Sequence, residues 1–401
     1  MKIKDILAGL KKRKNRNNRL SRITQHSGLH KIDIKKLKEG ARIQHLEDLI
    51  LGLDEVGNVG SSGAKKAIAK LRQIESNPST ITIKWDGSPA VIFGRNEEGE
   101  FILTDKSGFG AKGYDGKVKS ADGLEGMLKN RPGYEKNPQG YGDFIGKMKA
   151  IWSKVESNVP ADFRGYVHGD LLWFTTPQLD KGRLTFKPNT TLYSVDAQSD
   201  IGKKIADSDV GIVIHMAIDL DGNKNNVDMS RFQSGNTMIM PPVTMTQSPG
   251  VDIPAVDDLE KFLNKHSKSI DDLLNVPEEL KMKNFTDILY TYINNSVKTG
   301  NLSNLGNNFI DWIDTAKLSD PKKQRLAQWV TDNKDGFNAL FGFIKSIKLI
   351  KNQVINKLDS QKADIEASTG GQRGGEGYVI DKDVKLVNRA GFTAANMAQQ
   401  R

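Results

Sequence analysis

The sequence contains no cysteine. This absence excludes disulfide bonds, thiol catalysis and zinc sites built from cysteine, and it is typical of proteins in a reducing compartment. No apolar run approaches the roughly 18 residues that a membrane-spanning helix needs. The first residues also lack the apolar stretch of a secretory signal, because Ile3, Ile6 and Leu10 are interspersed with charged side chains. We therefore expect a cytoplasmic protein with no membrane partner.

Positive charge is unevenly distributed along the chain, which has a formal net charge of +10. Residues 1–39 contain 13 Lys or Arg and three acids, so they account for the whole excess and the remainder is close to neutral. A basic segment of this kind binds polyanions without sequence preference. We predict a basic N-terminal arm over residues 1–40 that binds nucleic acid, with a solvated tail as the alternative.

Hydrophobic periodicity divides the rest of the chain into a mixed segment, a helical segment and a short return to strands. Before residue 254 it predicts helices over 41–76 and 121–157, a β-hairpin over 81–95, and strands over 101–106, 166–173, 183–187, 191–195 and 210–220. Beyond residue 254 it predicts about five helices over 255–366, a flexible glycine-rich loop over 368–375, and strands over 376–380 and 384–387. The predicted fold class is α+β.

The predicted hairpin over 81–95 contains Lys84-Trp85-Asp86-Gly87, which has the form Lys-x-Asp-Gly. This form resembles the nucleophile motif of the covalent nucleotidyltransferases, which include ATP-dependent DNA ligases, RNA ligases and mRNA capping enzymes. Their reaction needs a lysine amine that attacks the α-phosphorus of a nucleotide. A strand end beside a tight turn would hold the Lys84 amine at the rim of a cleft. The alternative is that these residues have no catalytic role and form an ordinary hairpin turn with an exposed strand lysine.

Three later segments follow in the order of that family. An apolar strand with Gly-Asp-Leu carries Asp170 where ligases carry glutamate, a Glu-Gly-x-Val segment begins at Glu376, and a last strand carries Lys385. The resemblance implies that Lys84, Asp86 and Lys385 are catalytic. It also implies that Asp170 and Glu376 hold Mg²⁺ or orient the ribose. The nucleotide-binding residues that it implies are Lys84, Lys106, Asp170, Glu376 and Lys385.

Other residues match the family more loosely. Lys106 and Lys112 lie at the glycine-rich segment 107–113 and are candidates for phosphate contacts, with a flexible surface loop as the alternative. Tyr193 or His215 could pack on the nucleotide base, and either is equally compatible with a place in the core.

The resemblance implies an enzyme that uses ATP and Mg²⁺ and forms a lysyl-AMP intermediate. Ser88, directly after Asp-Gly, resembles RNA ligases, and the 16 residues after Lys385 leave no room for the OB-fold domain of DNA ligases and capping enzymes. We therefore expect an RNA-ligase-like protein that prefers RNA to DNA. The resemblance also suggests a bacteriophage protein, which would act in the cytoplasm of the host cell. The alternative is a non-catalytic nucleic-acid-binding protein on a decayed nucleotidyltransferase fold. Two departures from the family favour it: position 170 has aspartate in place of glutamate, and the last strand has only one lysine, Lys385, where many ligases have two.

The positions of these motifs also predict the domain organisation. Residues 41–254 and 368–401 would form one ligase-type nucleotidyltransferase domain of antiparallel sheets around a cleft, and 255–367 would be a helical insertion. This arrangement requires the strand over 376–380 to join the same sheet system as the strand before Lys84. It also requires the Glu376 carboxylate to face the Lys84 amine.

Overall fold

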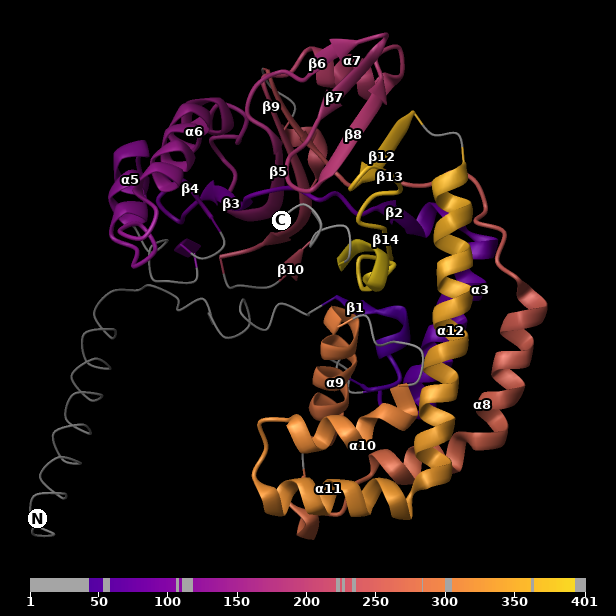
Figure 1. Ribbon diagram of the computed structural model, residues 1–401. Coiled ribbons are helices and arrows are strands. Elements are labelled where there is room, and N and C mark those ends of the chain that lie inside the picture. Colours follow the sequence, from indigo (N-terminus) through magenta and orange to yellow (C-terminus); the bar gives the residue numbers. More distant parts are fainter. Residues whose placement is uncertain are drawn as a thin grey trace, which may run out of the picture.

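A computed structural model of the chain describes residues 43–52, 58–105, 108–109, 118–220, 224–225, 228–232, 236–282, 284–299, 305–361 and 364–393. Over these residues the protein has an α+β fold with three sheets (Figure 1). The strands lie together in the upper part of the view, and helices α8 to α12 lie together below and to the right. The predicted basic arm, Lys106 and Lys112 lie outside the described residues. Within the described ranges, no helix has both the length and the apolar character to cross a membrane.

The four-stranded sheet joins segments that are far apart in the sequence. Its strands, in spatial order, are β1 (Gln44–His45), β15 (Val384–Leu386), β14 (Tyr378–Ile380) and β2 (Ile81–Ile83). β1 runs parallel to β15, and the other neighbours are antiparallel. The pairing of β14 with β2 confirms that the strand predicted after Glu376 lies beside the strand that precedes Lys84.

The six-stranded sheet carries Asp170 on its central strand. Its strands are β10 (Lys224–Asn225), β9 (Val210–Ile218), β5 (Gly165–Trp173), β3 (Ala90–Arg95) and β4 (Phe101–Asp105), with β11 (Thr237–Met240) parallel to β9. Helices α5 (Ala121–Lys129) and α6 (Pro138–Glu156) cover one of its faces. Helix α6 starts at a favourable cap, because the Asn137 side chain accepts a hydrogen bond from the Gly140 N–H and Pro138 occupies the first turn.

The five-stranded sheet is antiparallel throughout and lies beside the other two. Its strands are β13 (Gln372–Arg373), β12 (Ile365–Thr369), β8 (Thr191–Asp196), β7 (Arg183–Phe186) and β6 (Gln178–Asp180). Helix α7 (Asp200–Ala206) contacts β7 and β8. The hydrophobic core of the five-stranded sheet includes Trp85, which lies between β2 and β3 in the sequence.

The helices share one core with the four-stranded sheet. They are α3 (Ser61–Ser76), α8 (Ile253–Leu274), α9 (Phe285–Thr299), α10 (Leu305–Thr315), α11 (Asp320–Asp332) and α12 (Lys334–Ser360), with the short 3₁₀ turns η1 (Leu46–Asp48) and η5 (Glu278–Leu280). Of the other 3₁₀ turns, η2 (Pro78–Thr80) directly precedes β2, and η4 (Met229–Phe232) packs in the core of the six-stranded sheet. Ile81, Ile380 and Leu386 of the sheet are fully buried in this core. One face of the four-stranded sheet is therefore covered by helices, which leaves the other face for polar side chains.

The prediction of helical structure over residues 41–76 is wrong for the first part of that segment. Residues 44–48 form β1 and the turn η1, and a regular helix begins only with α3. The apolar side chains of Leu46, Leu49 and Ile50 are buried, so their spacing is that of a single 3₁₀ turn packed on the core. Pairing with β15, which no local pattern reveals, holds this segment extended.

The β-hairpin predicted over 81–95 is also wrong. β2 and β3 are both present, but β2 belongs to the four-stranded sheet and β3 to the six-stranded sheet. Residues 84–89 therefore link two sheets, and Asp86 is held by residues 189–191 instead of closing a turn. The Asp-Gly pair predicted a turn because it is a local turn signal. A local signal carries no information about hydrogen bonds to a segment about a hundred residues away.

The loop predicted over 368–375 is largely a β-hairpin. β12 and β13 pair through Thr369 and Gln372, and the two residues between them, Gly370 and Gly371, have φ of 59° and 79°. Two positive φ angles are the requirement of the tight turn that best matches strand twist, and glycine meets it without strain. The return to strands thus begins with β12 at Ile365, soon after α12 ends.

Candidate active site

Strand alternation in the four-stranded sheet collects polar groups on the face opposite the helices. The register pairs Thr82 with Val379, Val379 with Lys385, and Lys385 with His45, so these side chains share one face. All four are half-buried. Lys84 follows Thr82 by two residues at the end of β2, and its backbone N–H donates to the Gly377 carbonyl at 2.9 Å. The sheet therefore carries two lysines, Lys84 and Lys385, in the same region.

The side chain of Lys84 forms an ion pair with the Glu376 carboxylate. The two residues are 292 positions apart in the sequence, and their side chains are 20% and 19% exposed. Burial raises the pKa of Glu376 above its ordinary value, and the positive charges of Lys84 and Lys385 offset only part of that effect. The expected facing of Glu376 and Lys84 is confirmed.

The Asp86 carboxylate anchors the segment that carries Lys84. It accepts hydrogen bonds from the Asn189 side chain at 2.9 Å, from the Thr190 N–H and hydroxyl at 3.0 and 2.7 Å, and from the Thr191 N–H at 3.0 Å. Burial acts to raise the pKa of Asp86, but these hydrogen bonds outweigh it and hold the pKa below its ordinary value. Asp86 therefore remains an acceptor and fixes the link between the two sheets.

Trp85 and Tyr193 form the apolar support beneath this segment. The Trp85 ring is 1% exposed and lies against the rings of Phe186 and Tyr193, with centroid distances of 6.1 and 4.7 Å. The Tyr193 hydroxyl accepts a hydrogen bond from the Asp86 N–H at 2.6 Å. Burial raises the pKa of Tyr193, so the phenol stays neutral. Tyr193 is thus a buried residue that fixes the backbone next to Lys84, and it also lines the cleft beside Lys84.

Asp170 lies next to the same segment on strand β5. A Cβ atom placed on Gly87 would be 2.4 Å from the Asp170 Cβ, so only glycine allows this close approach. The Asp170 carboxylate is 2.8 Å from Nε2 of His215 on β9, and the two side chains are 21% and 30% exposed. The structure therefore brings Lys84, Asp86 and Glu376 together, with Asp170 against Gly87.

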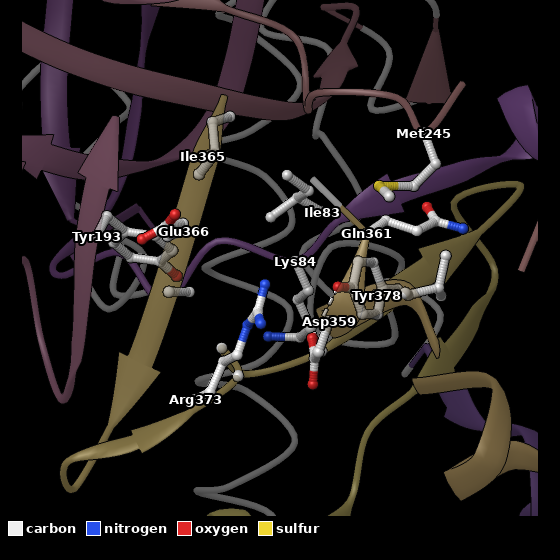
Figure 2. A pocket seen from close by; sticks show the side chains of 15 residues that line it. Ile83, Lys84, Tyr193, Met245, Asp359, Gln361, Ile365, Glu366, Arg373 and Tyr378 are labelled. Atoms are coloured by element: carbon white, nitrogen blue, oxygen red, sulfur yellow. Dashed lines mark hydrogen bonds between the residues drawn. The ribbon is translucent and has the colours of Figure 1, made fainter. Parts of the chain in front are cut away.

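A cleft opens beside Lys84, with about 540 Å³ of empty space that communicates with solvent (Figure 2). Its walls are the end of β2, the β12–β13 hairpin, the chain around Tyr378 and the C-terminal end of α12. Arg373 and Lys84 both point into it. The Tyr378 hydroxyl donates to the Asp359 carboxylate at 2.8 Å, and burial raises the pKa of Asp359 above its ordinary value.

The arrangement fits a phosphorylated ligand better than a metal ion alone. Lys84 and Arg373 line the cleft, and cations of this kind suit phosphate groups. Among the described residues, no group of three or more acidic or histidine side chains is gathered to hold a metal. Mg²⁺ is often held by one or two carboxylates together with substrate phosphates. Asp170 and Glu376 would hold it only in that way.

Sequence reasoning missed several residues of the cleft. Asp359 ends a helix, and Arg373 lies within the glycine-rich segment, so neither belongs to a recognisable motif. The signal that could have located Arg373 is the Gly-Gly pair before it, which predicts a tight hairpin between extended residues. No comparable local signal marks Asp359.

Comparison of the chain with curated proteins and with solved structures found no match. Residues 41–401 match the model of one family, described as a family of unknown function (DUF6267). Because this match covers most of the chain, the protein belongs to the DUF6267 family.

Proposed function

We propose that the protein is an ATP-dependent, ligase-like nucleotidyltransferase that forms a covalent adduct on Lys84 and then acts on nucleic acid, RNA in preference to DNA. The observation that carries the proposal is the ion pair between Lys84 and Glu376. The two residues belong to different motifs of the resemblance and are 292 positions apart. Chance matches to two motifs give no reason for their side chains to meet. A ligase-type fold with an inserted group of helices and a cytoplasmic location are part of the same proposal.

In the proposed reaction, the Lys84 amine nitrogen forms a bond to the α-phosphorus of ATP, and the bond from that phosphorus to the pyrophosphate oxygen breaks. Pyrophosphate leaves with the electron pair. The proton that the Lys84 ammonium must lose passes to the Glu376 carboxylate, whose raised pKa suits it to accept a proton. The product is a phosphoramidate between Lys84 and AMP, and a second step transfers AMP to the end of a polynucleotide.

Other residues contribute by position and charge. Lys385 shares the sheet face that leads to Lys84, so its ammonium can offset charge that develops on the phosphate oxygens. Asp170, fixed by His215 and close to Gly87, is placed to accept a hydrogen bond from the ribose or to share a cation with Glu376. Mg²⁺, which the resemblance implies, would neutralise the phosphates when bound.

The test is transfer of label from α-labelled ATP to the full-length protein in the presence of Mg²⁺. We expect one label per chain, stable to base and labile to acid, and no label from γ-labelled ATP. Lys84→Ala should abolish labelling. The matched control is Lys70→Ala, since Lys70 is also a half-buried, ion-paired lysine (13% exposed, 2.5 Å from Asp381) but lies on helix α3 outside the cleft.

Two outcomes would refute the assignment. Labelling that persists in Lys84→Ala would remove Lys84 as the nucleophile. A wild-type protein that takes up no label but binds RNA would favour the non-catalytic alternative, in which the same cleft holds nucleic acid without chemistry. Equal loss of label in Lys70→Ala would mean that the variants report folding and not reaction.

A further inference from the structure

Helix α12 connects the group of helices to the candidate active site. It spans 27 residues, from Lys334 to Ser360, and runs from the helices in the lower part of Figure 1 up to the strands. Its first half packs in the core shared with α8, α10 and α11. Its last turn lies beside β14 and forms one wall of the cleft that Lys84 enters. A rigid helix of this length transmits position from one end to the other.

The last turn of α12 contacts the chain on both sides of Glu376. On one side, the Asp359 carboxylate accepts the hydrogen bond from the Tyr378 hydroxyl at 2.8 Å. On the other side, the second carboxylate oxygen lies against Gly374, where a Cβ atom would be only 2.8 Å away. Tyr378 and Gly374 are each two residues from Glu376, so Asp359 is hydrogen-bonded to one side of the short segment that carries this carboxylate and lies close to its other side.

The contact with Tyr378 is well fixed. The Tyr378 side chain is only 8% exposed and packs in the same core as α12. Arg373, on the neighbouring strand β13, is the cation that faces Asp359, and it lines the same cleft (Figure 2). A hydrogen bond between half-buried groups holds geometry more firmly than an exposed ion pair, because water competes less for it.

We propose that Asp359 is a positioning residue: through its hydrogen bond to Tyr378 it sets where the Glu376 carboxylate lies relative to the Lys84 amine, so that the position of helix α12 affects the reaction at Lys84. This inference rests on the proposed function. It assigns the helical region a part in the chemistry, since any movement of α12 moves the partner of the nucleophile. Catalytic groups displaced by about 1 Å can lose about 100-fold in rate.

The experiment is single-turnover labelling of the full-length protein over a series of α-labelled ATP concentrations up to saturation, which gives the maximal rate constant, the ATP concentration for half-maximal rate and the labelled fraction separately. Asp359→Ala should lower the rate constant about 10- to 100-fold, with the ATP concentration for half-maximal rate unchanged. Asp359→Asn should recover most of the rate, because its amide oxygen still accepts the Tyr378 hydrogen bond. Tyr378→Phe, which removes one oxygen atom and keeps the packing, should resemble Asp359→Ala.

The matched control is Asp271→Ala. Asp271 is a half-buried carboxylate on α8 that accepts hydrogen bonds from the N–H and the hydroxyl of Ser61 at 2.7 and 2.6 Å, so its loss should destabilise the helical region to a similar degree. In the described part of the chain, Asp271 is hydrogen-bonded to Ser61 on α3 and not to the segment around Glu376. We expect Asp271→Ala to lower the melting temperature and to leave the labelling rate constant unchanged.

Several results would overturn the inference. If Asp359→Ala and Tyr378→Phe lower only the labelled fraction and the melting temperature, Asp359 is merely structural. If Asp359→Asn is as slow as Asp359→Ala, its charge matters and its position does not. A normal rate in both Asp359→Ala and Tyr378→Phe would reject the inference alone, whereas an unlabelled wild-type protein would reject the proposed function and this inference with it.

Discussion

Replacing Lys351 by methionine should destabilise the protein strongly, because Lys351 is a buried cation. Its side chain is 1% exposed, and its ammonium donates to both oxygens of the Glu47 carboxylate at 2.6 Å. Glu47 is itself 3% exposed. The Arg389 guanidinium is 3.7 Å from Glu47 but already binds Asp48 at 2.9 Å, so it cannot fully replace the lost partner.

Methionine keeps the length of the side chain and removes the charge. Breaking one side of a buried ion pair costs about 3–5 kcal/mol, because the remaining charge stays buried without a partner. Total stabilities are about 5–15 kcal/mol, so the loss is a large share. Adding Glu47→Leu should recover most of it, since apolar replacement of a whole buried pair is close to neutral.

The penalty also has a defined pH dependence. In the wild type, burial acts to raise the pKa of Glu47, but the charge and hydrogen bonds of Lys351, together with the charges of His45 and Arg389, outweigh it and lower the pKa from 4.5 to about 2. The pair therefore stabilises the fold fully above pH 4.5, and this stability is lost as pH falls toward 2. Without Lys351, burial would raise the Glu47 pKa, so the penalty of Lys351→Met should shrink as pH falls toward 4.5.

Denaturant unfolding of the full chain, followed by circular dichroism at several pH values, measures these differences. The control is Lys268→Met, because the ion pair of Lys268 with Asp272 is exposed (87% and 57%) and should contribute less than about 1 kcal/mol. The reasoning fails if Lys351→Met costs no more than Lys268→Met. It also fails if the double variant is less stable than Lys351→Met alone.

Other changes test separate parts of the structure. Asp86→Ala leaves the donors at residues 189–191 unpaired and should cost about 1–3 kcal/mol in unfolding experiments; no loss would contradict its anchoring role. Gly87→Ala should disturb Asp170 and slow labelling, since the added Cβ would be 2.4 Å from the Asp170 Cβ; a normal rate would argue against that contact. Burial lowers the pKa of His45 from 6.5 to about 2, so unfolding takes up a proton below pH 6.5. As pH falls below 6.5, the free energy of unfolding of the wild type should therefore decrease by about 1.4 kcal/mol per pH unit relative to that of His45→Gln. Parallel curves of unfolding free energy against pH for the two proteins would refute this. Deleting residues 1–39 should weaken RNA binding and flatten its salt dependence by several units of slope; equal slopes would exclude the arm.

The sequence predicted most elements whose stability is local. The strands that became β5, β7, β8 and β9 and the helices between 253 and 360 follow from apolar periodicity, because each buries a continuous stripe or face. The pairing of β14 with β2 followed from motif order, which carries information about distant contacts.

The errors share one physical cause. β1 is held extended by β15, and the Lys84 segment is held by residues 189–191, so in both places a distant partner decides the conformation. The contact of Asp359 with Tyr378 is of the same kind. A local pattern cannot reveal such partners, and only the Gly370-Gly371 turn had a signal that could have been used.

The composition of the four-stranded sheet has a consequence for synthesis and folding. Its strands come from residues 44–45, 81–83, 378–380 and 384–386, so the sheet cannot close until nearly the whole chain is available. Pairings of such sequence separation form late and slowly, because loop closure precedes any gain in contacts. A ribosome-bound chain would thus complete its helices while Lys84 still lacks Glu376. Lys84 would therefore acquire its partner Glu376 only at the last stage of folding. If Lys84 is the nucleophile that we propose, an incompletely synthesised chain would not react with ATP.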